Sequence, residues 1–114
     1  MRIKEIQKIL EAEMLTGSEL AEKIIEGAAA SDLMSDVLTL NKSNLLLLTG
    51  LTNPQTVRTA EMTDIAAVCF VRGKSPQQET ISLAEKKKIP LLSTKLSMFE
   101  ACGRLYAAGL ACDH

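Results

Sequence analysis

Three short apolar runs at regular intervals constrain the fold of this chain more than any other sequence feature. They are Leu45–Leu48, Ile65–Val71 and Ile89–Leu92, and they begin about 20 to 24 residues apart. Strands that are apolar at nearly every position are buried on both faces, as in a parallel sheet covered by its crossover helices. The runs therefore predict the central strands of a parallel sheet.

A helix signal follows each of these runs. Asn53-Pro54 places a capping side chain before a proline at the first helical position, and Ser75-Pro76 repeats the arrangement with Gln78 three residues after the serine. Ser97–Glu100 forms a second capping box, and Lys86–Lys88 suits the negative end of the middle helix. Strands that alternate with helices predict an α/β fold, here a three-layer αβα sandwich with a mostly parallel sheet.

The N-terminal third of the chain is less regular. Apolar residues recur every three to four positions over Ile3–Leu10 and predict an amphipathic helix. Short strands are expected at Glu13–Leu15 and Lys23–Ile25, with Gly27–Ala30 continuing the second one. Ser31-Asp32 then precedes a predicted helix through Leu38 and can cap it. The 114 residues suit a single domain over positions 1–114.

Composition and charge argue against several classes of protein. No apolar run approaches the ~20 residues of a membrane-spanning helix. Thirteen basic and fourteen acidic residues give a net charge of −1, and aromatic residues make up 3%, so nucleic-acid binding is not expected. The three cysteines, Cys69, Cys102 and Cys112, have no CxxC spacing, and no signal peptide opens the chain, which together favour a cytoplasmic location. The single histidine is His114, so no His-based metal site or catalytic dyad is expected.

The segment Gly73-Lys74-Ser75 resembles part of a phosphate-binding P-loop. The full motif needs a glycine five residues before Gly73, where this chain has Val68, and Pro76 removes a backbone donor from the region. The segment is therefore interpreted as an ordinary strand-to-helix turn. No nucleophile has a histidine partner, so no catalytic residue is predicted.

Ligands of open α/β sheets bind beyond the carboxyl ends of the strands. The loops expected there supply hydroxyl groups, helix N-termini and three cations, which favours a small anionic ligand. Caps and turns in contact with solvent are the alternative interpretation of the same residues. The predicted ligand-binding residues are Thr49, Gly50, Thr52, Asn53, Arg72, Gly73, Lys74, Ser93, Thr94 and Lys95.

A second polar cluster comprises Ser31, Asp32, Ser35 and Asp36. The two aspartates are four positions apart, so on one helix they would share a face and could bind Mg²⁺ together with a phosphate. The favoured interpretation is that Asp32 caps the helix, with no metal bound. As a cap, Asp32→Ala would cost about 1 kcal/mol and Asp32→Asn would be nearly neutral.

Three segments resemble the DRTGG domain family, which is similar to the N-terminal domain of bacterial HPr kinase/phosphorylase. They are Gly27–Leu38 (GAAASDLMSDVL), Glu85–Thr94 (EKKKIPLLST) and Ser97–Leu105 (SMFEACGRL). The resemblance implies an αβα fold, an oligomeric tendency and a sensing or scaffolding role, without a reaction. The Asp-Arg-Thr-Gly-Gly tract itself is missing, since the nearest segment is Glu22–Gly27, and the P-loop kinase domain of HPr kinase has no counterpart in this sequence.

These observations lead to the hypothesis of a free-standing, non-catalytic regulatory or scaffolding domain without a cofactor. It would bind a small anionic ligand or a partner protein and act as a homodimer. One alternative is a small Mg²⁺-dependent phosphotransfer or nucleotide-processing enzyme that uses Asp32, Asp36 and the Arg72–Lys74 loop. Another is a purely structural dimerisation domain.

The segment Gly27–Leu40 is the predicted dimer interface. Its first residues have almost no side-chain bulk, and its apolar residues are too many for one narrow helical stripe. The alternative is that its helix lies between the sheet and the N-terminal helix. The predicted interface residues are Gly27, Ala28, Ala29, Ala30, Leu33, Met34, Val37 and Leu38.

Overall fold

Six strands form one sheet in the order β1-β5-β4-β3-β2-β6 in a computed structural model that describes residues 1–112. Strands β2 to β6 run parallel to one another, and the edge strand β1 pairs with β5 in the antiparallel direction. His114 lies outside the described residues. The strands are β1 (Glu13–Thr16), β2 (Gly27–Ala30), β3 (Leu45–Thr49), β4 (Ile65–Phe70), β5 (Leu91–Ser93) and β6 (Ala111–Cys112).

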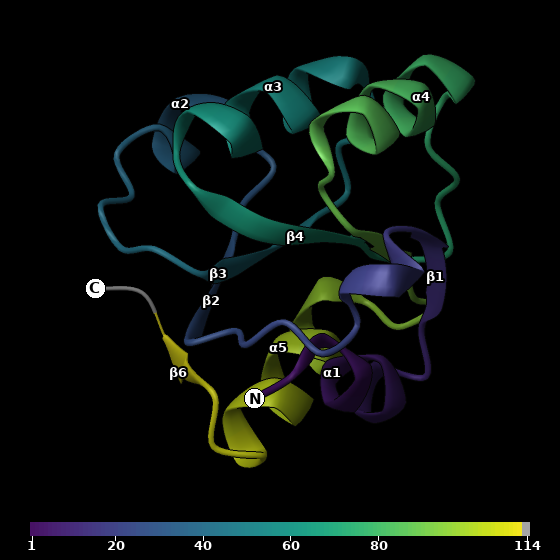
Figure 1. Ribbon diagram of the computed structural model, residues 1–114. Helices are drawn as coiled ribbons and strands as arrows, with labels where there is room; N and C mark the ends of the chain where they lie inside the picture. Colours follow the sequence, from purple (N-terminus) through teal and green to yellow (C-terminus); the bar gives the residue numbers. More distant parts are fainter. Residues whose placement is uncertain (113–114) are drawn as a thin grey trace.

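Helices cover both faces of the sheet, so the predicted three-layer fold is confirmed (Figure 1). On one face lie α2 (Met34–Val37), α3 (Pro54–Met62) and α4 (Gln78–Lys87). On the other lie α1 (Ile3–Leu10) and α5 (Met98–Ala107). A 3-10 turn at Ser18–Leu20 follows β1.

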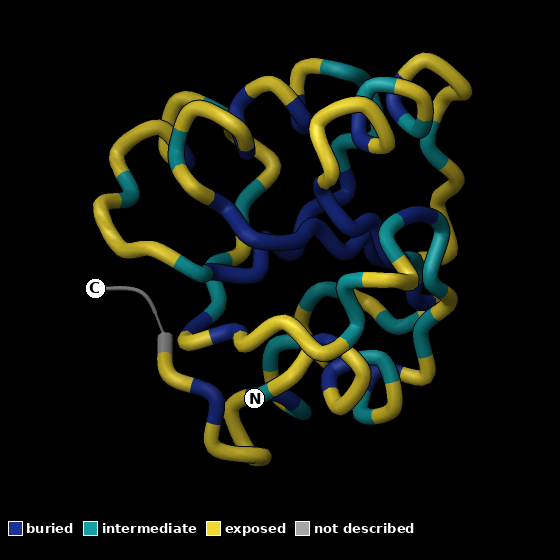
Figure 2. The backbone as a smooth tube through the Cα atoms, in the orientation of Figure 1, coloured by how far each residue is buried: buried dark blue, intermediate teal, exposed yellow. Residues whose placement is uncertain are grey.

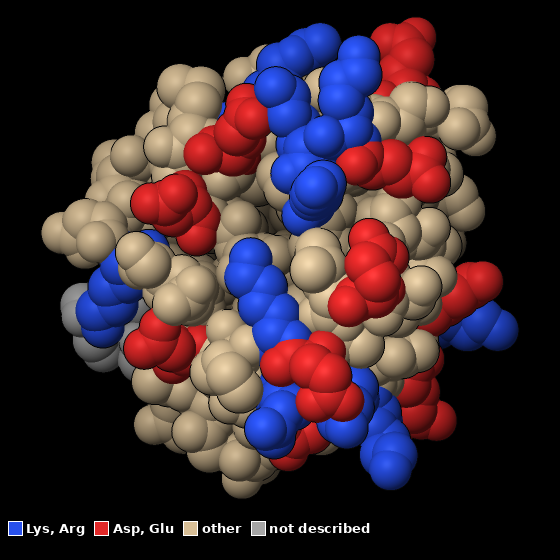
Figure 3. All heavy atoms as spheres, viewed as in Figure 1, with Lys and Arg blue, Asp and Glu red and all other residues tan. Residues whose placement is uncertain are grey.

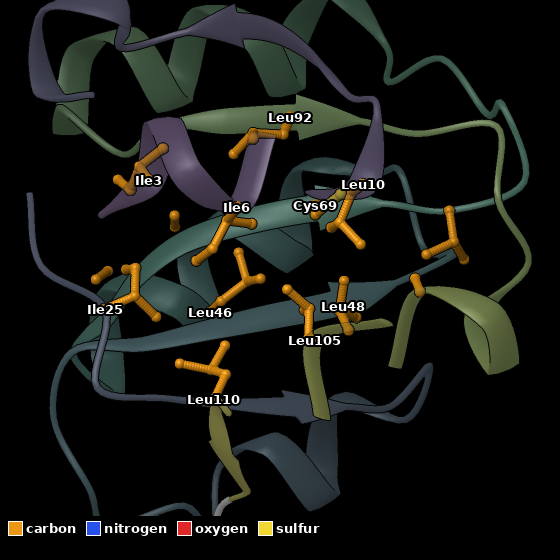
Figure 4. Close-up of a cluster of buried hydrophobic side chains, with 14 residues drawn as sticks. Ile3, Ile6, Leu10, Ile25, Leu46, Leu48, Cys69, Leu92, Leu105 and Leu110 are labelled. Carbon is orange, nitrogen blue, oxygen red and sulfur yellow. The ribbon is translucent and has the colours of Figure 1, made fainter. Parts of the chain in front are cut away.

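Side chains along the central strands point alternately to the two faces of the sheet and contribute to two separate hydrophobic cores. Leu45, Leu47, Val68 and Phe70 pack with α2, α3 and α4. Leu46 and Leu48 point the other way and pack with Ile6 and Leu105, among others, from the helices on the opposite face (Figure 4). Because successive side chains of a strand point to opposite faces, a continuous apolar run serves both cores, and β3 and β4 are buried along their length (Figure 2).

Some of the predicted helix starts are found in the structure and one is not. The side chain of Asn53 accepts from the N–H of Gln55, and that of Ser97 accepts from the N–H of Glu100, so these two predicted caps are confirmed. The predicted start at Ser75-Pro76 is wrong, because α4 begins at Gln78 with Gln77 in the cap position and no side-chain cap. Lysines end α4 as predicted, with Lys88 in a left-handed C-cap.

One prediction for the N-terminal third is wrong, and one alternative interpretation is excluded. Lys23–Ile25 forms no strand, since only Ile24 makes an isolated bridge, to Arg2, and β2 begins at Gly27. The buried Ile25 instead packs into the core beneath α1. Helix α2 does not lie between the sheet and α1, because the two helices cover opposite faces.

The antiparallel edge strand depends on one buried hydroxyl. Thr16 donates to the carbonyl of Ile89 at 2.9 Å and accepts from the N–H of Leu91 at 3.0 Å, next to an irregularity in the β1–β5 pairing. Both backbone partners belong to buried residues, so a missing hydroxyl would leave them without a hydrogen bond.

We expect Thr16→Val to lower the free energy of unfolding by about 1–3 kcal/mol, because valine has the shape of threonine but leaves two buried backbone groups unpaired. Urea unfolding measures the change. Thr16→Ser keeps the hydroxyl and is expected to lose less. Equal losses in the two variants would show that the methyl group, and not the hydroxyl, matters at this position.

Candidate functional site

The carboxyl ends of β2, β3, β4 and β5 meet at one edge of the sheet because these strands are parallel. The chain leaves β2 at Ser31, β3 at Gly50, β4 at Val71 and β5 at Thr94. Neighbouring strand ends therefore bring together residues far apart in the sequence. This edge holds the loops for which the sequence predicts an anion-binding function.

Asp32 bridges the ends of β2 and β3. Its Oδ1 accepts from the backbone N–H of Gly50 at 2.6 Å and from the hydroxyl of Thr49 at 3.1 Å. Its Oδ2 lies 3.9 Å from Nη2 of Arg72, which follows β4. We call the three donors around this carboxylate, Thr49, Gly50 and Arg72, the Gly50 site.

These contacts favour the ionised carboxylate. The hydrogen bond from Gly50 is the largest cause that lowers the pKa of Asp32 below its ordinary value. The Thr49 hydroxyl and the charges of Arg72 and Lys74 also lower this pKa, whereas partial burial opposes them. The Gly50 site is therefore an environment that stabilises negative charge.

The prediction that Asp32 caps a helix is wrong. Helix α2 begins only at Met34, and Leu33 occupies the cap position without a side-chain hydrogen bond. The nearby hydroxyl of Ser31 accepts from the N–H of Leu33 instead. Because Asp32 precedes the helix, Asp32 and Asp36 do not share a helical face. Within residues 1–112, no three His, Cys, Asp or Glu side chains come together to hold a metal ion.

The Arg72–Lys74 segment is an ordinary turn, as the sequence predicts. Arg72 and Gly73 both have left-handed backbones, with φ of 60° and 67°. The N–H of Arg72 donates to the carbonyl of Leu96, that of Gly73 to Thr94 and that of Lys74 to Val71. All three N–H groups are thus used inside the protein, and none lines a phosphate-binding cradle.

Some predicted ligand-binding residues already make hydrogen bonds within the protein. Thr94 is buried, and its hydroxyl donates to the carbonyl of Leu10 and accepts from the N–H of Leu96. Ser93 donates to the carbonyl of Lys74, and Asn53 caps α3. The carbonyl of Thr52 accepts from Thr80. These four residues fix the loops in place.

The predicted cations remain at the surface. Arg72, Lys74 and Lys95 are exposed. The Lys95 side chain passes beside Gly73, since its Cγ lies 3.9 Å from where a Cβ on Gly73 would be. Arg72 and Lys74 both act on the carboxylate of Asp32. The structure thus brings Gly50 and Arg72 together at Asp32, a residue that the sequence analysis assigned to a separate cluster, and Lys74 adds positive charge there.

A cleft of about 480 Å³ opens at the edge of β2, and its lining extends to Ser31, where the chain leaves that strand. Within residues 1–112, β6 pairs with Gly27 and Ala28 of β2, and the remaining residues of β2 line the cleft. Sequence reasoning missed this cleft because its walls come from helices on both faces of the sheet. Its lining includes Ala29, Ala30, Asp36, Leu40, Cys102 and Tyr106.

Charges of both signs are mixed over the surface. On the face drawn in Figure 3, basic side chains gather over α3 and α4, where Lys86 and Lys87 end α4, and acidic residues surround them. No helix in the described part of the chain is long and apolar enough to cross a membrane.

Comparison with family models gives a match to the DRTGG domain over residues 5–108. The chain belongs to the DRTGG domain family. Sequence comparison with curated proteins gives no match. The family resemblance carried by Gly27–Leu38, Glu85–Thr94 and Ser97–Leu105 is thereby confirmed.

A solved structure shares the fold of this DRTGG domain. It contains the CBS and DRTGG domains of the regulatory region of Clostridium perfringens pyrophosphatase, in complex with the activator diadenosine tetraphosphate. The two chains superimpose with a TM-score of 0.68 at 16% sequence identity. The match covers 91% of this chain and 45% of the other, so this chain spans less than half of that regulatory region.

We expect Asp32→Ala to lower the free energy of unfolding by about 1–3 kcal/mol, because the buried N–H of Gly50 loses its acceptor. Asp32→Asn keeps an acceptor oxygen and is expected to lose less. Urea unfolding at neutral pH measures both changes.

The same variants test the charge of Asp32. Because its folded pKa is lowered, ionised Asp32 stabilises the fold above its ordinary pKa of 3.8, and this contribution is lost as pH falls through the lower folded value. The stability difference between wild type and Asp32→Asn should therefore shrink below about pH 4. A difference that stays constant down to pH 2 would contradict this role.

Proposed function

We propose that this DRTGG domain is a non-catalytic regulatory domain that binds a small anionic ligand at the loops after β3, β4 and β5. The observation that carries the proposal is the Gly50 site, where a carboxylate is held by a backbone N–H at 2.6 Å with Arg72 and Lys74 nearby. Backbone N–H groups and cations of this kind also recognise phosphate groups. Family membership supports the same proposal, because one DRTGG-containing structure of the same fold is a regulatory region in complex with the activator diadenosine tetraphosphate.

A regulatory function fits this chemistry better than an enzymatic one. An Asp32–Asp36 magnesium site would need two adjacent carboxylates, whereas Asp32 precedes α2 and is bonded to Gly50. The Arg72–Lys74 turn offers side-chain charge but uses its own N–H groups internally. A cytoplasmic location is part of the proposal and rests on the sequence features given above, including three cysteines without CxxC spacing.

Ligand binding is tested by thermal unfolding in the presence of AMP, ATP, acetyl phosphate and pyrophosphate. A ligand at 100 times its dissociation constant stabilises by about 2.7 kcal/mol, so at least one of these compounds should raise the unfolding temperature. Lys74→Ala should reduce that shift, because Lys74 is an exposed cation of the loop after β4 whose charge acts on Asp32.

Lys42→Ala is the matched control. Lys42 is also exposed, but it precedes β3 and so lies at the amino end of the sheet. It should leave the ligand-induced shift unchanged. Equal effects of the two variants would contradict a site at the carboxyl ends, and no shift with any compound would favour a structural domain without a ligand.

We also propose that the domain acts as a homodimer through the Gly27–Leu40 segment. Leu33 and Leu38, on either side of α2, are 57% and 48% exposed, which supports an apolar contact surface. Strand β2 itself contributes less than its small residues suggest, because a Cβ on Gly27 would lie 3.1 Å from the carbonyl oxygen of Ala111 in β6. The close backbone approach at Gly27 is therefore made within the chain.

We expect the double variant Leu33→Glu/Leu38→Glu to stay folded and to sediment as a monomer at micromolar concentration, where the wild type sediments as a dimer. Met62→Glu is the control, since Met62 is 70% exposed on α3 and lies outside the segment. A monomeric wild type would overturn the homodimer, and a wild-type dimer that persists in the double variant would overturn this interface.

A further inference from the structure

The buried N–H of Gly50 needs an acceptor. Gly50 is buried at the end of β3, and the acceptor of its N–H is a carboxylate from another segment of the chain. That carboxylate is supplied from the solvent side, because the Asp32 side chain is 52% exposed. The group that satisfies Gly50 is thus a surface group, and another oxyanion from solution can take the same position.

The cations near the Asp32 carboxylate are not fully used by it. Arg72 approaches Asp32 only to 3.9 Å, and within residues 1–112 its guanidinium makes no protein hydrogen bond. Lys74 also acts on Asp32 and makes no ion pair with the described residues. Two cations therefore keep hydrogen-bonding capacity for an anion that carries more charge or more oxygens than Asp32 does.

The backbone fixes Arg72 in this place. Its φ of 60° is a left-handed conformation that arginine seldom adopts, and the hydrogen bond from its N–H to Leu96 holds it there at 2.7 Å. Side chain and backbone together direct the guanidinium toward Gly50. A Cβ built on Gly50 would lie 3.5 Å from Nη2 of Arg72 and 3.5 Å from Oδ1 of Asp32. The absence of a side chain at Gly50 therefore leaves space between the cation and the carboxylate.

We propose that Asp32 is an internal competitor for the ligand: its carboxylate occupies the position at the Gly50 site that a phosphate group of the ligand takes on binding. This inference rests on the proposed function. The ligand class is a phosphate or polyphosphate, because the group that displaces Asp32 has to accept from Gly50 and Thr49 and also reach Arg72 and Lys74. A neutral acceptor could pair with the N–H of Gly50 but would leave Arg72 without the negative charge that Asp32 now provides.

The experiment measures pyrophosphate binding by isothermal titration calorimetry to the full chain and to three variants. Asp32→Asn removes the competing charge but keeps an acceptor for Gly50, so it should fold and bind about tenfold more tightly than wild type. Asp36→Asn removes the same charge four residues away, in α2, and should change affinity by less than about twofold. Gly50→Ala places a methyl group between Arg72 and Asp32 at ordinary contact distance, so it should fold and bind at least about tenfold more weakly.

Each outcome distinguishes this inference from the proposed function. Wild-type binding that Asp32→Asn leaves unchanged or weakens would overturn the competition and leave the ligand site standing. An equal gain in Asp32→Asn and Asp36→Asn would overturn it too, because net charge alone would then explain the gain. Absence of pyrophosphate binding in every variant would overturn the site itself.

A second measurement on the wild type does not depend on any variant. Titration with pyrophosphate should shift the amide signal of Gly50 and the carboxyl carbon signal of Asp32 in NMR spectra, with the same saturation curve. Pyrophosphate that binds while both signals stay in place would overturn the proposal.

Discussion

Two cores share one set of strands, and the rest of the structure depends on this constraint. Leu45 and Leu47 of β3 face α2, α3 and α4, while Leu46 and Leu48 face α1 and α5. A sheet that is apolar on both faces requires helices on both, and parallel connections provide them. Parallel connections in turn place the ends of β2 to β5 at one edge. The polar chemistry of the domain is therefore concentrated where the apolar strands stop.

At this edge, buried polar groups determine which side chains are needed as hydrogen-bond partners. Gly50 and the threonines Thr49 and Thr94 are buried where regular pairing ends, so their polar groups need partners. Thr94 finds them inside the protein, at the carbonyl of Leu10 and the N–H of Leu96. Gly50 finds its partner in Asp32, half exposed and in an adjoining loop. Two similar needs are thus met by a buried contact at Thr94 and by a half-exposed contact at Gly50.

The sequence predicted the layers of the fold better than the contacts of the site. Apolar runs located β3, β4 and β5, and side-chain caps located α3 and α5, because each of these signals is local. Asp32 was assigned to a cap because Ser31-Asp32 precedes a helix, and its partner Gly50 lies 18 residues away. The sequence does hold one clue to this contact, because Asp32 and Gly50 each follow the end of a predicted strand. Using it requires knowing that β2 and β3 are neighbours, which is set by packing. The same dependence explains why Lys23–Ile25 looked like a strand, since Ile25 is buried beneath α1 without sheet pairing.

A regulatory domain needs a segment that binding can move at small cost, and the chain between β2 and β3 has that property. Helix α2 has four residues and Val37 is its only fully buried one, so little apolar burial holds it against the sheet. The bonds of Asp32 to Thr49 and Gly50 tie the start of this segment to the end of β3. Under the proposed competition, an anion that replaces Asp32 would satisfy Gly50 and release the segment, and with it Leu33, which is exposed beside α2. Ligand binding at the Gly50 site and movement of the exposed Leu33 would then both follow when the ligand replaces Asp32 as the hydrogen-bond acceptor of Gly50. Such coupling needs no long pathway through the core, because both features lie on the same short stretch of chain.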